Sequence, residues 1–511
     1  MRASIVALGA GVWLLAAPAF ADPVSSVSQY GVTWTFAQPC ESGQFASGDY
    51  WVVGPCEITS VSPAPTGTRN GSAVNPKGGH QGYDDRGGEF DTAENVSFPY
   101  TLKVDESLVS SVSKAEGAEI KNVGCLQSQA VLTAVSAALP ATALRPSYAG
   151  TFKQYLDTGN IHWDLLPKLP PPSNAPDGAD LRKMAERPRI DHMNSWTIQN
   201  SCAEDNWYNG AGAHNCYGRE YSTFISNAAM YTMLDEPDRD ELVVSMIQLG
   251  IDNYGVLEAG GGWSPNGGHH SGRKWPIVFA GRLLDDCDLL KVGEKFDDSH
   301  FGEDGQTYAG NSGKALFGWD CGGGQGSYFE SGCSGGGAKD CRDPAGMVDG
   351  CPDYRNCCTS GYWVGQMLST LMLHAETIWN HQPYFDYVDR WMTGDVDGGG
   401  SASSAFIEGM WTQYRNDLPP GSPASTVCGA GGSGGGAGAS SGGGAGTGAG
   451  GSASGGASSG GTSSGGTSNG AADSSDDGGC GCRTAPSPAT SLAGLLLAAG
   501  AALSALRRRR R

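Results

Sequence analysis

The chain has 511 residues, of which 80 are glycine, and its formal net charge at pH 7 is −20. A field of that sign repels polyanions, so we expect no nucleic acid partner, and an acidic polysaccharide would need a locally basic cleft. The length is sufficient for one large domain or two ordinary ones, each with a substantial core. We find no Walker-type phosphate loop and expect no cofactor.

The first 21 residues have the order of a secretory signal. Met1 and Arg2 precede an apolar run over residues 5–15, and Ala19-Phe20-Ala21 forms a small-residue cleavage site. We therefore expect export, with the mature chain beginning at Asp22.

Residues 22–119 are predicted to be rich in strands. Residues 32–36 alternate between apolar and polar, and residues 50–55 are rich in strand-forming side chains and end in a turn. Glycine, proline, asparagine and aspartate dominate residues 62–98, which we expect to form long loops. The sequence leaves open whether this segment is a separate domain or a collar on the helices predicted after it.

From residue 120 to residue 427 the apolar spacing becomes helical. We predict helices over residues 123–139, 220–234, 237–255, 275–290, 362–380, 384–392 and 403–414. The predicted fold class is therefore mainly α: an α/α toroid-like helical domain with a β-rich N-terminal segment and a disulfide-stapled insert. An irregular helical bundle would fit the number of helices equally well.

The fifteen cysteines indicate an oxidising location. Six of them lie in residues 321–358, which are poor in large apolar side chains and which we expect to be held by disulfides. Cys40 with Cys56, and Cys202 with Cys216, are spaced like local loop closures, and one thiol is left over. No CxxC pair with a nearby histidine supplies a zinc ligand set, so we expect no metal site.

Four successive parts make up the end of the chain. A Gly/Ser/Ala tract over residues 428–479, which we expect to be a disordered linker, precedes Cys480 and Cys482; an apolar segment and five arginines complete residues 480–511. This order closely resembles the MYXO-CTERM sorting signal of myxobacteria. The resemblance implies a sorting protease as a partner, processing or lipid attachment at Cys480 or Cys482, and anchorage at the outer-membrane surface through the lipid or the tail. An ordinary membrane tail anchor is the alternative.

Two polar, aromatic loops, over residues 194–220 and 261–275, each stand directly before an apolar helix. Loops in that position can present side chains and helix N-terminal amides to one cleft. The candidates for proton transfer are Tyr217, His214, His269 and His270. Those for neutralising a substrate carboxylate are Arg219, Arg273, Asn215 and Asn266, and those for other sugar contacts are Trp207, Trp263, Trp275 and Lys274.

These residue types suit the β-elimination of a uronic-acid polymer. A base removes the C5 proton, a cation or amide stabilises the carboxylate as it gains enolate character, and an acid protonates the leaving oxygen. Residues 126–415 are similar in pattern to the toroidal polysaccharide lyases that degrade alginate and glucuronan. The resemblance implies a catalytic set of Tyr217, His269 or His270, Arg219 or Arg273, and Asn215 or Asn266, acting on an acidic polysaccharide.

Other interpretations of the same residues remain open. A glycoside hydrolase would use two carboxylates, for which the candidates are Glu204, Asp205, Glu220 and Asp252. A metal hydrolase would combine His269 and His270 with Asp84 or Asp85, and a surface adhesin or glycan-binding protein would need no catalytic residues. The histidines could equally belong to a solvated loop, as could Arg273 with Lys274. Arg219 could form a structural ion pair, and the tryptophans could be core residues.

Overall fold

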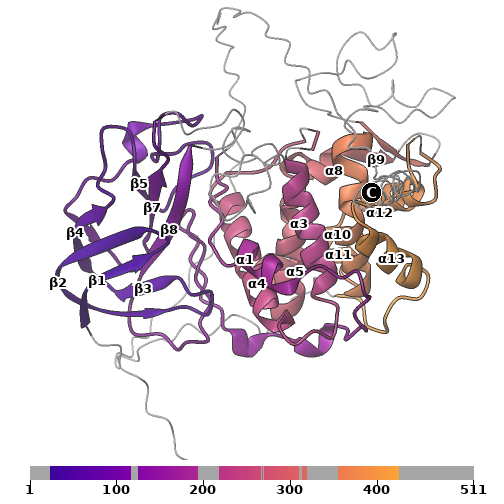
Figure 1. Cartoon of the computed structure of the whole chain (residues 1–511), viewed down its shortest axis with the longest axis horizontal. Coiled ribbons are helices and arrows are strands. Elements are labelled where there is room, and N and C mark those ends of the chain that lie inside the picture. The colour runs from indigo at the N-terminus through magenta and orange to yellow at the C-terminus, as the bar shows by residue number, and fades with distance from the viewer. Residues whose placement is uncertain are drawn as a thin grey trace, which may run out of the picture. The chain divides into compact units, whose positions relative to one another are not determined.

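The computed structural model describes residues 23–116, 125–193, 218–265, 267–268, 270–309, 313–318, 355–396 and 398–424. Within these ranges the fold is mixed, with a sheet at the N-terminal end and helices after it (Figure 1). No helix among the described residues has both the length and the hydropathy to cross a membrane.

The N-terminal strands of the described chain form one eight-stranded sheet in the order β5-β7-β8-β3-β2-β4-β6, with β1 paired to β2. Neighbouring strands are antiparallel except β3 and β8, which are parallel. The strands are β1 (Pro23–Gln29), β2 (Val32–Gln44), β3 (Tyr50–Val53), β4 (Cys56–Ser62), β5 (Ser72–Val74), β6 (Tyr100–Leu102), β7 (Ser107–Ser113) and β8 (Leu126–Val135).

Alternation along β2 explains the first core of the protein. Val32, Trp34 and Phe36 are buried on one face of this strand, where they pack with apolar residues of β4, β7 and β8. The predicted closure of Cys40 with Cys56 is confirmed, and this disulfide joins β2 to the start of β4.

Strand β8 replaces the helix that we predicted over residues 123–139, so that prediction was wrong. The strand pairs with β3 on one side and β7 on the other, and each of its residues except Gln127 is buried. A strand covered on both faces has a nearly continuous apolar run, and such a run does not distinguish a strand from a buried helix.

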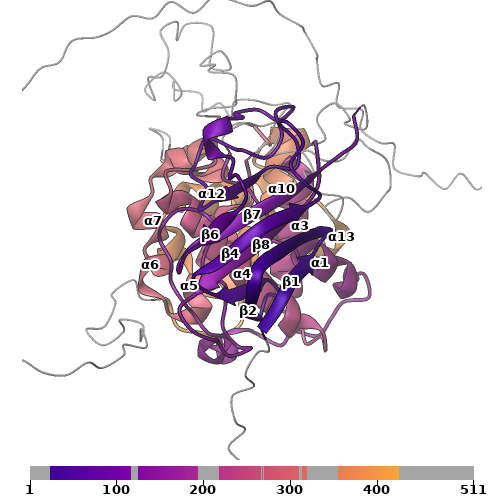
Figure 2. The same cartoon turned by 90° about the vertical axis from the view of Figure 1, so that its left-hand side faces the viewer.

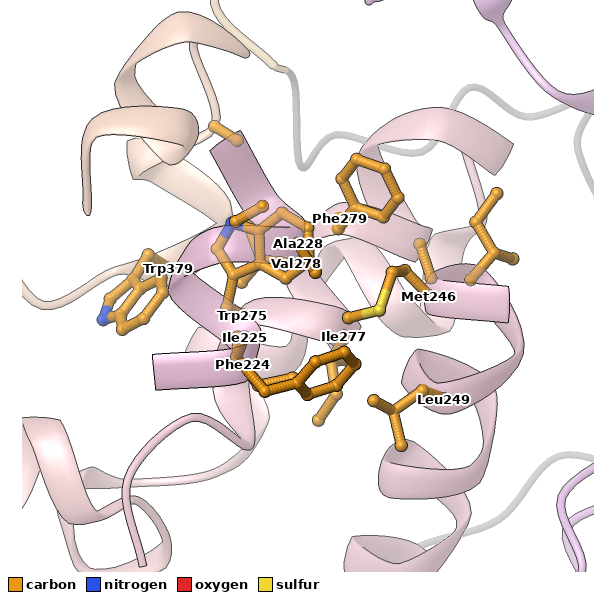
Figure 3. Close-up of a cluster of buried hydrophobic side chains, with 14 of the residues drawn as sticks. Phe224, Ile225, Ala228, Met246, Leu249, Trp275, Ile277, Val278, Phe279 and Trp379 are labelled. Carbon is orange, nitrogen blue, oxygen red and sulfur yellow. The ribbon is translucent and has the colours of Figure 1, made fainter. Parts of the chain in front are cut away.

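The helices of the described chain pack around a second, larger core. Side chains of α3, α4, α5 and α11 meet there, among them Phe224, Met246, Trp275 and Trp379 (Figure 3). The helices are α1 (Gly178–Ala185), α3 (Gly218–Tyr231), α4 (Arg239–Glu258), α5 (Lys274–Leu284), α6 (Cys287–Leu290), α7 (Val292–Lys295), α8 (Gly302–Gln306), α10 (Ser360–Met372), α11 (Glu376–Trp379), α12 (Gln382–Met392) and α13 (Ala405–Tyr414).

The predicted mainly α, toroid-like fold class is wrong. The described part of the chain is 37% helical and 21% strand, with a large curled sheet in its N-terminal region. Helix α10 contacts α3, α5, α12 and α13, so the helices share one centre in place of a ring of antiparallel pairs. Helical periodicity identifies an apolar face but does not specify how many neighbours cover it, and for that reason the spacing did not exclude a compact mixed fold.

The sheet and the helices are joined by a continuous core and by buried charges. Val109 and Val131 of the sheet belong to the same buried cluster as the helices, and in Figure 2 the strands cross in front of the helices. Arg145, after β8, donates to Asp49 at 2.6 Å and to Asp252 of α4 at 3.0 and 2.6 Å. The guanidinium of Arg145 therefore links the turn before β3 to α4.

Few of the remaining cysteines belong to the described residues. Cys125 is a buried free thiol, and Cys357 is bonded to its neighbour Cys358 in a π-helical turn, Arg355–Thr359. Cys202, Cys216 and the cysteines from 321 to 351 lie outside the described residues, as do the predicted linker and sorting tail.

Candidate functional site

Only some of the predicted site residues fall within the described chain. Arg219, Trp263, His270, Arg273, Lys274 and Trp275 are described. Outside the described residues lie Trp207, His214, Asn215, Tyr217, Asn266, His269, Glu204, Asp205, Cys480 and Cys482.

Asp191 is the centre of a buried cluster that includes Arg273. Its Oδ2 accepts from Nε of Arg273 at 3.0 Å and from Nε of Arg189 at 3.2 Å. The backbone N–H of Asp191 donates to the hydroxyl of Tyr148 at 2.8 Å, and Trp263 Nε1 donates to the backbone carbonyl of Asp191 at 3.2 Å. Two guanidiniums meet at one carboxylate, so positive charge is concentrated in this part of an acidic protein.

Tyr221, in the first turn of α3, lies against both arginines. The guanidinium carbons of Arg273 and Arg189 are 4.0 and 4.2 Å from the centre of its ring. Burial raises the pKa of Tyr221 to about 12, although both arginines act to lower it. The phenol is therefore protonated near neutral pH and donates its proton only to a strong base, such as a departing alkoxide oxygen.

His270 is a neutral imidazole with a defined tautomer. Its Nδ1 lies 2.6 Å from the carbonyl oxygen of Ser264, and because a carbonyl only accepts, Nδ1 carries the hydrogen. Burial, with a further contribution from Arg273, lowers the pKa of His270 to about 4. The lone pair on Nε2 has no hydrogen-bond partner among the described residues and is available to accept a proton, but the lowered pKa makes it a weak base.

Glu303, on α8, binds the backbone between His270 and Arg273. The N–H of Gly272 donates to Glu303 Oε1, and Gly272 has a φ of +96°, a conformation that favours glycine. The other oxygen, Oε2, has no partner among the described residues. Burial raises the pKa of Glu303 to about 7.

A second histidine adjoins this cluster on the side of the sheet. His192 directly succeeds Asp191 in the chain, and its ring centre lies 5.8 Å from those of both Tyr83 and Tyr148. Burial lowers the pKa of His192 to about 4. The long loops of the N-terminal part thus contribute Tyr83 to the surroundings of the site.

The remaining predicted residues have structural partners. Lys274 is ion-paired with Asp304, and Arg219 is ion-paired with Glu220 and donates to the carbonyl of Cys357. Trp263 and Trp275 are fully buried, and Trp275 stacks on Phe279 with ring centres 4.6 Å apart. In this conformation neither indole presents a face to solvent.

The acids proposed for hydrolysis or metal binding are also engaged. Asp252 binds Arg145, and Glu220 binds Arg219. Asp84 is ion-paired with Arg86, and Asp85 with Arg69.

Sequence reasoning missed Arg189, Asp191 and Glu303. The first two belong to the stretch Arg187-Pro-Arg-Ile-Asp-His192, in which charges alternate with apolar residues directly before the first candidate loop. This density of charged residues next to a candidate loop could have indicated that the stretch belongs to the site. Glu303 lies in a short Gly-flanked segment whose proximity to His270 only the tertiary structure reveals.

No protein-family model matches the chain, and no curated protein or solved structure is significantly similar to it. The chemistry of the cluster must therefore be inferred from its own geometry.

Proposed function

We propose that the protein is a secreted polysaccharide lyase that cleaves a uronic-acid-containing polymer by β-elimination. The observation that carries the proposal is the neutral His270, whose Nε2 lone pair has no partner among the described residues. It lies in a cluster where two arginines bind the carboxylate of Asp191. A base next to guanidinium groups is what proton removal beside a carboxylate requires.

Each step of the reaction has a residue suited to it. His270 Nε2 takes the C5 proton, and the positive charge of Arg273 and Arg189 stabilises the substrate carboxylate as it becomes an enolate. The electron pair then forms the C4–C5 double bond as the C4–O bond breaks. Tyr221, a protonated phenol, supplies a proton to the leaving oxygen.

The cluster is shielded in this conformation. His270 is 3% exposed and Arg273 is fully buried, so a polymer reaches them only after local opening. Exclusion of water strengthens electrostatic interactions inside the site, and this favours charge stabilisation once substrate has entered.

A second candidate function is the hydrolysis of a neutral glycan. Two carboxyl groups of the cluster, those of Asp191 and Glu303, each have one oxygen that no described residue binds. A pair of carboxyl groups is the catalytic equipment of most glycoside hydrolases. This candidate replaces the acids that we proposed from the sequence. Both oxygens of Asp252 are bound by Arg145, and Glu220 is ion-paired with Arg219.

The two ends of the sequence indicate the place of action. We propose that the signal over residues 1–21 exports the chain and that the tail, processed at Cys480 or Cys482, anchors it to the outer-membrane surface. A Cys480→Ser, Cys482→Ser double variant is then expected to keep its tail, whereas the wild type loses the tail and gains a lipid. Mass spectrometry that finds the full tail on the wild type would reject processing at these cysteines.

The lyase is tested with protein made in an oxidising compartment and incubated with alginate, glucuronan, pectate and glycosaminoglycans. A rise in the ultraviolet absorbance of the unsaturated uronate with any one polymer is expected. His270→Gln should lower kcat by about 100-fold or more, and His162→Gln, at an exposed histidine, should leave it unchanged.

Other outcomes distinguish the alternatives. New reducing ends without the ultraviolet product would establish a hydrolase. If folded protein binds a polymer without cleaving it, the chain is a glycan-binding surface protein. A His270→Gln variant with full activity would remove His270 from the mechanism.

A further inference from the structure

We propose that Asp298, Asp304 and His381 form a binding site for a divalent metal ion. One ligand atom from each residue lies within 4.8 Å of the others. The proposal is independent of the lyase reaction, because none of these residues takes part in it.

The three ligands come from different elements that meet at α8. Asp298 begins a 3-10 turn, Asp298–His300, and Asp304 lies in α8, whereas His381 directly precedes α12. Asp304 and His381 are buried, and the Asp298 side chain is 56% exposed. A cation can therefore approach from the side of Asp298.

Hydrogen bonding determines which nitrogen of His381 is available. Its Nε2 lies 3.0 Å from both the carbonyl oxygen and the hydroxyl oxygen of Thr307. That hydroxyl already donates to the carbonyl of Glu303 at 3.0 Å, so both oxygens facing Nε2 are acceptors. Nε2 must therefore carry a hydrogen.

The other nitrogen then faces a carboxylate. Nδ1 of His381 lies 3.1 Å from Oδ1 of Asp298. In the neutral ring this arrangement would set a nitrogen lone pair against a carboxylate oxygen, and only a positive charge between them makes it favourable. A metal-binding histidine commonly donates its second ring N–H to a backbone carbonyl, as His381 does here.

The carboxylate of Asp304 already accepts from two side chains. Its Oδ2 is ion-paired with Lys274, and its Oδ1 accepts from Trp379 Nε1 at 2.8 Å. Lys274 leaves one net negative charge on the group when His381 is neutral. Each carboxylate oxygen has a second lone pair, so Asp304 can bind a cation and keep both contacts.

One imidazole with two carboxylates suits Zn²⁺ or Mn²⁺ better than Ca²⁺ or Mg²⁺, which prefer oxygen ligands alone. The ion would join the turn at Asp298, α8 and the start of α12. Since α8 also carries Glu303, a bound ion would help to hold the carboxylate that contacts Gly272.

The test uses the full chain, made without a histidine tag, freed of metal with a chelator and dialysed against Mn²⁺ or Zn²⁺. We expect about one bound equivalent of either ion, and a higher melting temperature in its presence. Asp298→Asn and His381→Gln should each weaken binding by about tenfold or more.

His162→Gln is the matched control, because His162 lies 4.0 Å from Asp164 in a histidine–aspartate pair and should not affect binding. The exposed Asp298 makes Asp298→Asn the decisive variant if His381→Gln does not fold. Absence of stoichiometric binding by the wild type would show that a proton alone supplies the charge at His381. That result, or unchanged affinity in Asp298→Asn, would overturn the proposal.

Discussion

Asp191, His270 and Glu303 are almost fully buried, yet each keeps one polar atom without a partner among the described residues. Leaving a buried polar group unsatisfied costs about 1–3 kcal/mol, and such groups call for a functional or structural explanation. These groups lie around residues 270–273, and we therefore place the proposed chemistry there.

At the same scale, Gly272 allows a direct test of how the cluster is held. A Cβ at Gly272 would lie 3.1 Å from the ring of Tyr221, and its φ is +96°. Gly400 has a φ of +100° but open space around its Cβ. Alanine at either position should cost about 1–2 kcal/mol from the backbone conformation, and Gly272→Ala about 1 kcal/mol more from crowding.

Urea unfolding of the two variants measures this difference. Gly272→Ala should also lower activity, because the shifted amide no longer meets Glu303, whereas Gly400→Ala should not. Equal losses of stability would mean that the contact with Tyr221 relaxes without cost.

At the scale of elements, the apolar spacing located four of the described helices closely. Helices α3, α4, α12 and α13 lie close to the predicted ranges. The predicted helices over residues 275–290 and 362–380 each prove to be two, broken at Asp285 and His374, both of which have a φ of 50°. Apolar spacing continues through such a break, so the pattern did not reveal it.

Arg145 provides the element-scale prediction, since it joins the sheet to α4. Arg145→Met would leave Asp49 and Asp252 buried without their cation, and we expect a loss of about 3–5 kcal/mol in the free energy of unfolding. Arg182→Met, which removes exposed ion pairs with Asp238 and Glu241, is the control and should change stability little.

Adding Asp49→Asn and Asp252→Asn to Arg145→Met should recover part of the lost stability, because no buried charge of this group then remains unpaired. Chemical denaturation monitored by circular dichroism measures the stability of the wild type, of Arg145→Met, of Arg182→Met and of the triple variant. No recovery in the triple variant would show that Arg145 acts through packing.

At the scale of the whole molecule, the buried histidines make unfolding depend on pH. The pKa of His192 is lowered to about 4 in the folded state, against an ordinary value of about 6.5. As pH falls below about 6.5, the unfolded chain takes up a proton that folded His192 does not, so stability declines.

His192→Gln removes this contribution. Between about pH 7 and about pH 5, the wild type should lose about 2 kcal/mol more than the variant. Comparing the two proteins cancels other groups, including Glu303, whose raised pKa acts in the opposite direction. Identical pH dependence in urea titrations would contradict burial of a neutral ring, and His162→Gln, at an exposed histidine, serves as the control.

The sequence by itself determined features that depend on local order. These are the Cys40–Cys56 closure and four helices, which follow from spacing, whereas the expected signal, linker and tail rest on composition and stay predictions. Only the tertiary structure decided that residues 126–135 form a central strand, that the helices share one core, and that Asp191 and Glu303 meet the loop of His270. These contacts join residues far apart in the chain. A periodic pattern identifies the apolar face of a helix or strand, but it does not identify the elements that pack against that face.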